Sequence, residues 1–262
     1  MVCIFLPGRS FIIPVVIKII FLFNLFFIVN HINFNTINPS TFNEKPIKMT
    51  AENIYLLRWS AILILTGGIL FWIGAGWPPY KQWMTADTKE YLSIISSHKT
   101  AWYIIHGFFV LGVVVSLLGL QNLSNTLMLL GGNKLLSSIL STGYIVGSVF
   151  WLLNIAFRLT VTLWAGQQFA TSQQIPESFQ TWMDWSNLIF AIYMVLAYVS
   201  IACLGFVFKE LAIIPAWGSW FCIIFGLSGI IGYMIQFPLF APPLMIHLPM
   251  MILGILILIK IP

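Results

Sequence analysis

The sequence predicts an all-α, polytopic transmembrane helix bundle, because it combines long apolar segments with very little charge. Of its 262 residues, 60% are hydrophobic and only 7% are charged, and the mean hydropathy is +0.96. A soluble domain carries about 25% charged residues. A chain with so little charge cannot cover itself with a water-facing surface, so we expect lipid to be its solvent.

Six core spans are expected after Met49, at about 56–76, 101–122, 136–164, 187–208, 217–237 and 243–260. Each segment holds about 18 or more mainly apolar residues, which is enough to cross a hydrocarbon core about 30 Å thick. Backbone groups in lipid must satisfy their own hydrogen bonds, so we expect these spans to be helices. Together they form a predicted six-helix transmembrane domain at 49–262.

Residues 1–48 form an atypical N-terminal segment. They contain no Ala, Trp or Tyr, whereas Phe, Ile and Asn make up about half of them. Our first interpretation is translated upstream sequence from a misplaced start codon, with Met49 as the actual start. The alternative is a seventh span at about 10–29, which is long enough to cross a bilayer although it contains Pro14 and Lys18.

Lys and Arg in short loops predict the orientation, because they are enriched on the cytoplasmic side. If the first core span starts in the cytoplasm, six basic residues lie inside, namely Lys45, Lys48, Arg58, Lys134, Lys209 and Lys260. Three then lie outside, namely Lys81, Lys89 and Lys99. This bias predicts a multi-pass cell-membrane protein with both ends of the core in the cytoplasm.

Nine tryptophans lie near predicted span ends and are expected to anchor the helices at the two membrane surfaces. They are Trp59, Trp72, Trp77, Trp102, Trp164, Trp182, Trp185, Trp217 and Trp220. The loop at 78–100 also contains an N-cap pattern around Asp87, followed by a short amphipathic helix. On the predicted orientation this helix lies along the outer interface.

Glycine patterns predict close helix packing, because small residues let backbones approach where no hydrophobic effect drives association. Gly143 and Gly147 form a GxxxG motif, and Gly226, Gly229 and Gly232 form a stripe. We expect the GxxxG motif to pack within the chain, and the alternative is a homo-oligomer contact through Gly143 and Gly147.

The polar residues whose placement in lipid costs free energy fall in one predicted leaflet of the bilayer. They are His106 and His247, each about one turn inside its span, Asn154 and Arg158 on one face of the third span, and Asp184 and Gln236 at span ends. We therefore expect one outward-facing polar layer.

Arg158 has a functional and a structural interpretation. An arginine inside a span costs about 2.5–3.5 kcal/mol at the bilayer centre, so it usually has a partner or faces a wet cavity. The functional interpretation is a pocket in which Arg158 meets an anionic group such as a lipid headgroup. In the structural interpretation, its side chain reaches the outer interface or pairs with Asp184 or Glu177.

His106 and His247 are expected at matching depth. Two neutral imidazoles on facing helices could hold b-type haem axially, or hold a metal together with Asp184. We favour two histidines that are hydrogen-bonded to backbone or water. We therefore expect no cofactor and keep haem b as the alternative.

No catalytic motif accompanies these residues. The sequence has no GxSxG, HExxH or phosphate-loop pattern and no carboxylate pair inside a span. Its basic residues are scattered singly, which argues against nucleic acid as a partner. We expect a non-enzymatic membrane protein that binds or moves a small amphiphile or lipid through the polar layer. The alternatives are a redox protein with haem b and a structural or partner-binding helix bundle.

The pattern Asp87-x-x-Glu90-Tyr-Leu, followed by Trp102-x-x-x-His106, Gly112 and Gly119-Leu, resembles bacterial six-helix integral membrane proteins whose domain has no known function. The ending Gly254-Ile-Leu-Ile-Leu-Ile-Lys260 is similar too, and the likeness covers most of residues 55–260. The resemblance implies a membrane location and six helices, but it implies no activity and no catalytic residues.

Overall fold

The computed structural model describes residues 49–77, 87–235 and 237–261. Within these ranges the chain is helical and contains no strand, which confirms the predicted all-α fold. The N-terminal segment 1–48, with its alternative seventh span, lies outside the described residues, and so does Gln236.

The six expected spans correspond to six helices. They are α2 (Ala51–Gly76), α5 (Lys99–Leu129), α6 (Lys134–Phe157), α8 (Phe179–Leu211), α9 (Ala216–Met234) and α10 (Leu244–Lys260). A π-helical turn, η3 (Arg158–Thr162), joins α6 to α7 (Leu163–Ser172). Two short elements complete the described chain, the helix α4 (Thr88–Ser97) and the 3₁₀ turn η4 (Pro238–Phe240).

Among the described residues, five helical segments are long and apolar enough to cross a membrane, with α6, η3 and α7 counted together. The sixth, α10, is also apolar but has only 17 residues. At a rise of about 1.5 Å per residue, α10 is still about 26 Å long.

Polar caps explain where several helices begin. The Asp87 carboxylate accepts a hydrogen bond from the backbone N–H of Glu90 at 2.9 Å, which starts α4 where the sequence predicts a short helix. Thr50 caps α2 and Asn133 caps α6 in the same manner. Helix α5 ends next to Gly131, whose φ of +91° is accessible to glycine at little cost.

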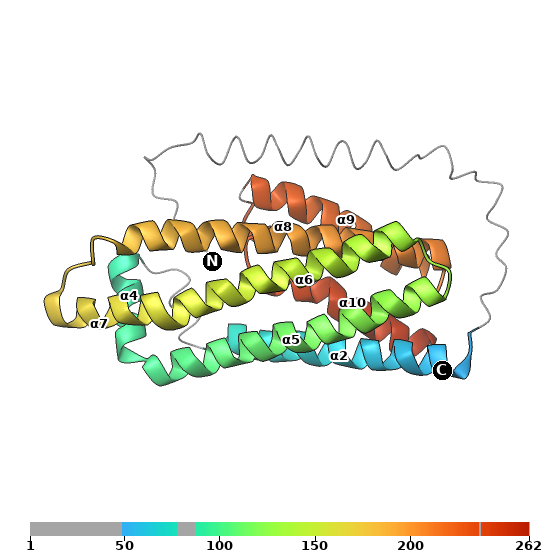
Figure 1. Ribbon diagram of the computed structural model, residues 1–262, viewed down its shortest axis with the longest axis horizontal. Helices are drawn as coiled ribbons and strands as arrows, with labels where there is room; N and C mark the ends of the chain where they lie inside the picture. Colours follow the sequence, from blue (N-terminus) through green and yellow to red (C-terminus); the bar gives the residue numbers. More distant parts are fainter. Residues whose placement is uncertain (1–48, 78–86, 236, 262) are drawn as a thin grey trace. The chain divides into compact units, whose positions relative to one another are not determined.

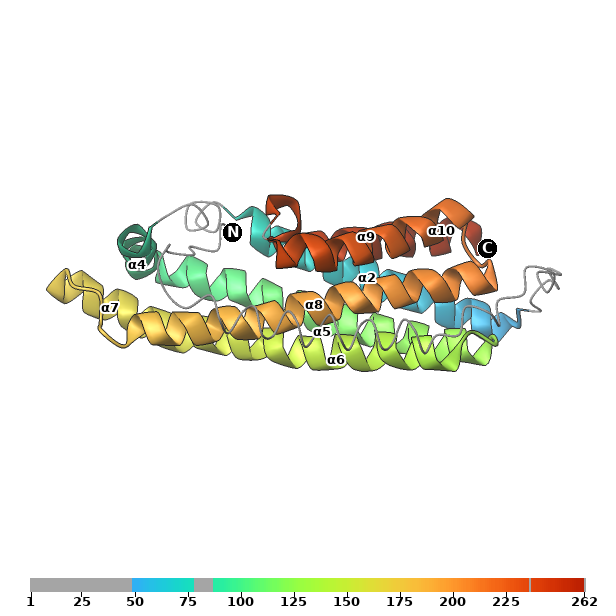
Figure 2. The ribbon, with the colours of Figure 1, turned by 90° about the horizontal axis from the view of Figure 1, so that it is seen from above.

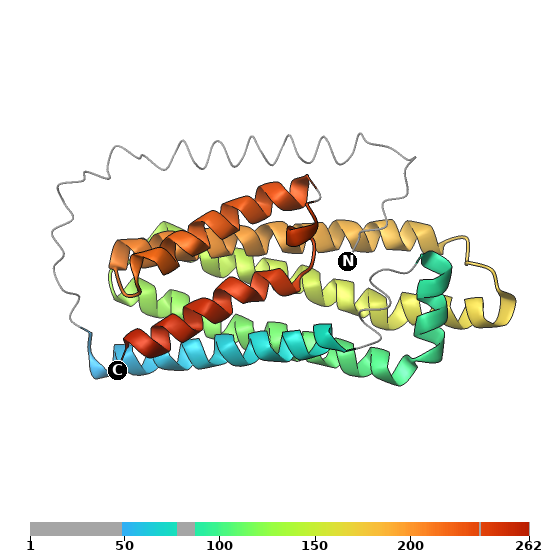
Figure 3. The ribbon, with the colours of Figure 1, turned by 180° about the vertical axis from the view of Figure 1, so that it is seen from behind.

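The helices are arranged so that α5 and α8 lie between α6 on one side and α2, α9 and α10 on the other (Figure 2). Helix α2 packs along α5, α6 along α8, α8 along α9, and α10 against α2. From behind, α10 runs between α2 and α9 (Figure 3). Helix α4 crosses the ends of the long helices and packs against α7 (Figure 1). We call this the α4 end of the bundle.

The predicted glycine contacts form within the chain. A Cβ added to Gly147 would lie 3.4 Å from the Cβ of Leu196 on α8, and Gly143 also faces Leu196. A Cβ added to Gly226 would lie only 2.6 Å from the backbone nitrogen of Ala202 on the same neighbouring helix. These contacts bring α6 and α9 close to α8.

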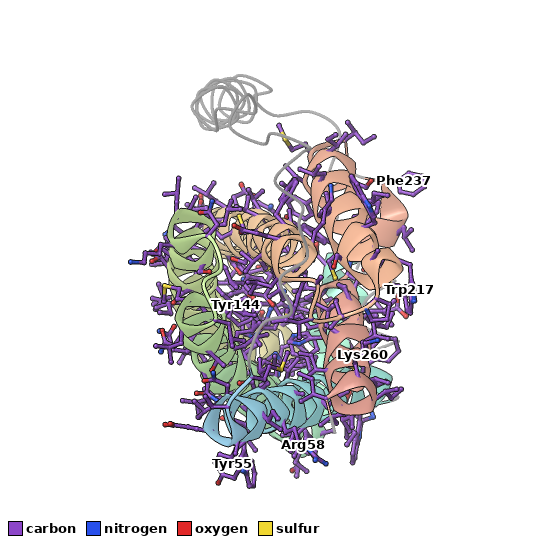
Figure 4. The ribbon with its side chains drawn as sticks, turned by 90° about the vertical axis from the view of Figure 1, so that its right-hand side faces the viewer. Tyr55, Arg58, Tyr144, Trp217, Phe237 and Lys260 are labelled. Carbon is purple, nitrogen blue, oxygen red and sulfur yellow. The ribbon has the colours of Figure 1, made fainter. Side chains whose placement is uncertain are left out.

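The outer surface of the bundle is apolar, as expected of a protein surrounded by lipid. Large exposed side chains line several helices, among them Leu118, Val149, Ile224, Ile231 and Ile259. Figure 4 looks along the bundle from the end that carries Arg58 and Lys260, with Trp217 and Phe237 on the rim and Tyr144 directed inward.

Eight of the nine expected membrane anchors are partly exposed, and Trp102 is the exception. The eight have exposed fractions of 36–58%, whereas Trp102 is only 2% exposed. Trp102 shares the inward face of α5 with His106 and Phe109, because residues four and seven positions apart lie on one side of a helix. The anchoring prediction for Trp102 is therefore wrong.

Candidate functional site: a buried arginine at the α4 end

Arg158 is a buried cation, with 8% of its surface exposed, at the junction between α6 and the π-helical turn. Its Nε donates a hydrogen bond to Oδ1 of Asn154, one turn earlier, at 2.8 Å. Its backbone carbonyl accepts a hydrogen bond from Nε1 of Trp102 at 3.0 Å. The side chain and the backbone of Arg158 are thus both held by buried groups. Single π-helical turns inside α-helices are frequent at functional sites.

Asn154 links Arg158 to a third helix. Its Nδ2 donates to the carbonyl oxygen of Ser186 at 2.9 Å and to the Ser186 hydroxyl at 2.7 Å. Asn154 is fully buried, and Ser186 is nearly so. The amide of Asn154 therefore fixes the orientation of the guanidinium relative to α8. The sequence prediction that Asn154 and Arg158 share one polar face is confirmed.

His106 lies beside Arg158, as the predicted polar layer requires. Its Nδ1 donates to the carbonyl oxygen of Trp102 at 2.7 Å, which fixes the tautomer of a neutral ring. The rings of Trp102 and His106 are 4.5 Å apart, and the indole of Trp102 is itself hydrogen-bonded to the carbonyl oxygen of Arg158. Together, Trp102, His106, Asn154, Arg158 and Ser186 form the Arg158 site.

Tyr91 of α4 covers the Arg158 site from the end of the bundle. It is buried, and its ring meets that of Trp102 edge-on at 5.9 Å. Burial raises the pKa of Tyr91 above its ordinary value, and the positive charge of Arg158 opposes this rise. Helix α4 buries Tyr91, Leu92 and Ile95 along one face, and this apolar face closes the site.

The three long helices bring their site residues to one level. His106 lies 23 residues before the end of α5, Arg158 lies 24 residues after the start of α6, and Ser186 lies 25 residues before the end of α8. At about 1.5 Å per residue, each is about 35–38 Å from the opposite end of the bundle. The Arg158 site is therefore a true layer, formed by α5, α6 and α8.

Asp184 does not join this layer. Its side chain is exposed and accepts a hydrogen bond from Nε2 of Gln180, one turn earlier on α8, at 2.9 Å. Asp184 lies only two residues before Ser186, but a shift of two positions turns a side chain to another face of a helix. Glu177 is also exposed, in the loop before α8.

His247 lies deeper in the bundle than His106, so the two histidines are not at matching depth. His247 is 13 residues before the end of α10, or about 20 Å from that end. The sequence prediction measured depth from the start of each span. It failed because α10 is short and begins well inside the bundle, whereas α5 begins at the α4 end (Figure 1).

Two phenyl rings connect the histidines. The His247 ring stacks on Phe71 at 4.2 Å, Phe71 contacts Phe109 at 4.7 Å, and Phe109 contacts His106 at 5.8 Å. Phe71 and Phe109 therefore link the two imidazoles through ring contacts. Among the described residues, no three His, Cys, Asp or Glu side chains form a group that could hold a metal.

A second polar group lies in the middle of the bundle and is not evident from the sequence. It consists of Trp151 on α6, Tyr193 on α8 and His247 on α10, and we call it the central cluster. Trp151 and Tyr193 rings are 4.9 Å apart, and Phe71 contacts both Trp151 and His247. On α6, the spacing of Ser148, Trp151 and Asn154 is the signal that could have placed these residues on one inward face.

Comparison of the chain with protein families, with curated proteins and with solved structures found no match.

Proposed function

We propose that this protein binds the anionic headgroup of a small amphiphile or lipid at the Arg158 site, without catalysing a reaction. The observation that supports this most directly is the buried guanidinium of Arg158, oriented by Asn154. A guanidinium recognises carboxylate and phosphate groups through parallel N–H···O hydrogen bonds. Burial strengthens such contacts, because the local dielectric is low.

The level of the site favours an amphiphile over a soluble anion. If the hydrocarbon core is about 30 Å thick, a group about 35 Å from the opposite end of the bundle lies near a membrane boundary. Charged headgroups meet the apolar chains of lipids at that boundary. An amphiphile could therefore place its headgroup at Arg158 while its chain stays against the apolar face of the bundle.

We propose further that the α4 end faces outward and that both ends of the core are cytoplasmic. The opposite end of the bundle carries Arg58, Lys134, Lys209 and Lys260. Among the residues that the structure describes, the lysines near the α4 end are Lys89 and Lys99. The excess of basic residues at one end supports this orientation.

Binding can be tested with dodecyl phosphate and, as its neutral match, dodecanol. In wild-type protein, dodecyl phosphate at about 100 times its Kd should stabilise the fold by about 2.7 kcal/mol, while dodecanol should not reproduce the effect. Arg158→Gln should abolish the stabilisation. Arg58→Gln removes an exposed arginine at the other end and should leave it unchanged.

Arg158→Lys serves as the second variant if Arg158→Gln does not fold. Lysine keeps the charge but lacks the planar fork of the guanidinium, so we expect folded protein with at least about tenfold weaker binding. Equal stabilisation of wild type and a folded Arg158→Gln variant would disprove the proposal. Wild-type protein that does not respond to dodecyl phosphate would favour a purely structural role for Arg158.

A further inference from the structure

Several buried polar atoms in the middle of the bundle lack a partner among the described residues. They are Nε1 of Trp151, the hydroxyls of Tyr193 and Ser148, and both ring nitrogens of His247. All four side chains have exposed fractions of 3% or less. Natural proteins pair nearly all such groups with protein atoms or ordered water, because an unpaired buried donor loses its hydration without replacement.

The same fold pairs comparable ring donors elsewhere. Tyr198, one turn and one residue after Tyr193 on α8, donates its hydroxyl to the carbonyl oxygen of Phe240 at 2.9 Å. The Nε1–H of Trp102 donates a hydrogen bond to the carbonyl oxygen of Arg158 at 3.0 Å. Among the described residues, unpaired buried hydroxyls also occur at Ser137 and Ser219, but the unpaired Trp151 and Tyr193 ring donors lie together in the central part of the bundle.

Ring contacts connect the aromatic side chains that carry these atoms, with Phe71 between Trp151 and His247. The ring pairs Trp151–Tyr193, Trp151–Phe71 and Phe71–His247 are 4.9, 5.5 and 4.2 Å apart. In α10, Pro249 has no N–H, so the carbonyl oxygen of Met245, two residues before His247, lacks its usual helical donor.

We propose that the central cluster binds ordered water molecules, which bridge Trp151, Tyr193 and His247. The aromatic rings are in direct contact, so the occupant must be small. The Trp151 N–H can only donate, so the occupant must accept a hydrogen bond, and the hydroxyls and the imidazole need both donors and acceptors. Water meets all these requirements, and a buried water molecule typically makes about three hydrogen bonds.

Bound water at this place extends a polar path from the Arg158 site into the middle of the bundle. Asn154 lies three residues after Trp151 on the same inward face of α6, and Arg158 follows one turn later. The path would connect the ring nitrogens of His247 to polar groups at the α4 end. This inference is independent of the proposed amphiphile.

Radiolytic hydroxyl labelling of the full-length protein in nanodiscs can detect such water, because radicals that form from bound water oxidise the side chains beside it. Tyr193 and Tyr198 are a matched pair, since both are buried on α8 and, of the two, only the Tyr198 hydroxyl has a hydrogen-bond partner among the residues that the structure describes. We expect Tyr193 and Trp151 to be oxidised several-fold faster than Tyr198. Equal rates for Tyr193 and Tyr198 would overturn the proposal.

The change Tyr193→Phe provides a second measurement, because it removes only the hydroxyl. If water binds that hydroxyl, the variant should unfold at a lower temperature than wild type, as Tyr198→Phe should when it loses its bond to Phe240. If the hydroxyl has no partner, Tyr193→Phe should unfold at an equal or higher temperature, which contradicts the proposal. An organic molecule that co-purifies with wild type and is lost in Trp151→Phe would also overturn it in favour of a different ligand.

Discussion

Replacing Gly112 by alanine should destabilise the bundle strongly, because this glycine lies where the α2 and α5 backbones touch. A Cβ added there would lie 2.9 Å from the carbonyl oxygen of Gly67, 2.9 Å from the backbone nitrogen of Phe71 and 3.0 Å from the Cβ of Phe71. None of these atoms can move by a simple side-chain rotation. We expect a loss near the upper end of the usual overpacking cost, about 3 kcal/mol.

Gly107 is the matched control on the same helix. It is exposed, and an added Cβ would meet nothing within 4 Å. Gly107→Ala should stabilise the helix by about 0.5–1 kcal/mol, since alanine loses less backbone entropy on folding. The two substitutions are chemically identical, so the difference between them, about 3.5–4 kcal/mol, measures the packing contact alone.

The assay is reversible unfolding in mixed micelles with increasing sodium dodecyl sulfate, followed by circular dichroism. The contact also positions the ring of Phe71, which lies against both His247 and Phe109. Gly112→Ala should therefore also change the near-ultraviolet spectrum of the aromatic core. If Gly112→Ala were as stable as Gly107→Ala, the close approach of α2 and α5 would be refuted.

Three further predictions concern the Arg158 site. Trp102→Phe keeps an aromatic ring but removes the indole N–H that donates to the carbonyl oxygen of Arg158. The free energy of unfolding should therefore fall by about 1–3 kcal/mol, whereas the same change at an exposed tryptophan should have little effect. Asn154→Ala should lower stability by about 3 kcal/mol or more in the same assay, and Ser186→Ala by about 1 kcal/mol, because the Ser186 carbonyl remains as an acceptor. Because burial raises the pKa of Tyr91, the contribution of its neutral hydroxyl to stability is complete below about pH 10 and is lost as the pH rises further. Between pH 9 and pH 11, wild type should therefore lose more thermal stability than Tyr91→Phe. Parallel losses would contradict this assignment.

The positions of the helices could be predicted from the sequence because lipid imposes a simple rule on composition. Apolar length alone located all six helices to within a few residues at most ends. The pairing of Arg158 with Asn154 was also predictable, since residues four apart lie on one face of a helix whatever its neighbours are. Both predictions depend only on local geometry.

The rest depends on how the helices are oriented and staggered, which local patterns do not contain. Trp102 has the composition and position of a membrane anchor, and only the rotation of α5 places its ring inside. His247 was assigned the wrong depth because the start of α10 is set by the turn after α9. Trp151 and Tyr193 were missed because an aromatic residue in an apolar run does not reveal whether it faces lipid or the interior.

Because the helices have unequal lengths, the hydrophobic length that the protein presents to the surrounding lipids differs from one side of the bundle to the other. Helices α9 and α10, on one side of the bundle, have 19 and 17 residues, or about 28 and 26 Å, whereas α5 and α8 have 31 and 33 residues, or about 46 and 50 Å. Hydrophobic mismatch of this kind is relieved by tilting of helices or by local thinning of the bilayer, at a cost of a fraction of a kcal/mol per Å. The thickness of the host membrane is therefore itself a variable that acts on this chain, and thin bilayers should accommodate its short side at the lowest cost.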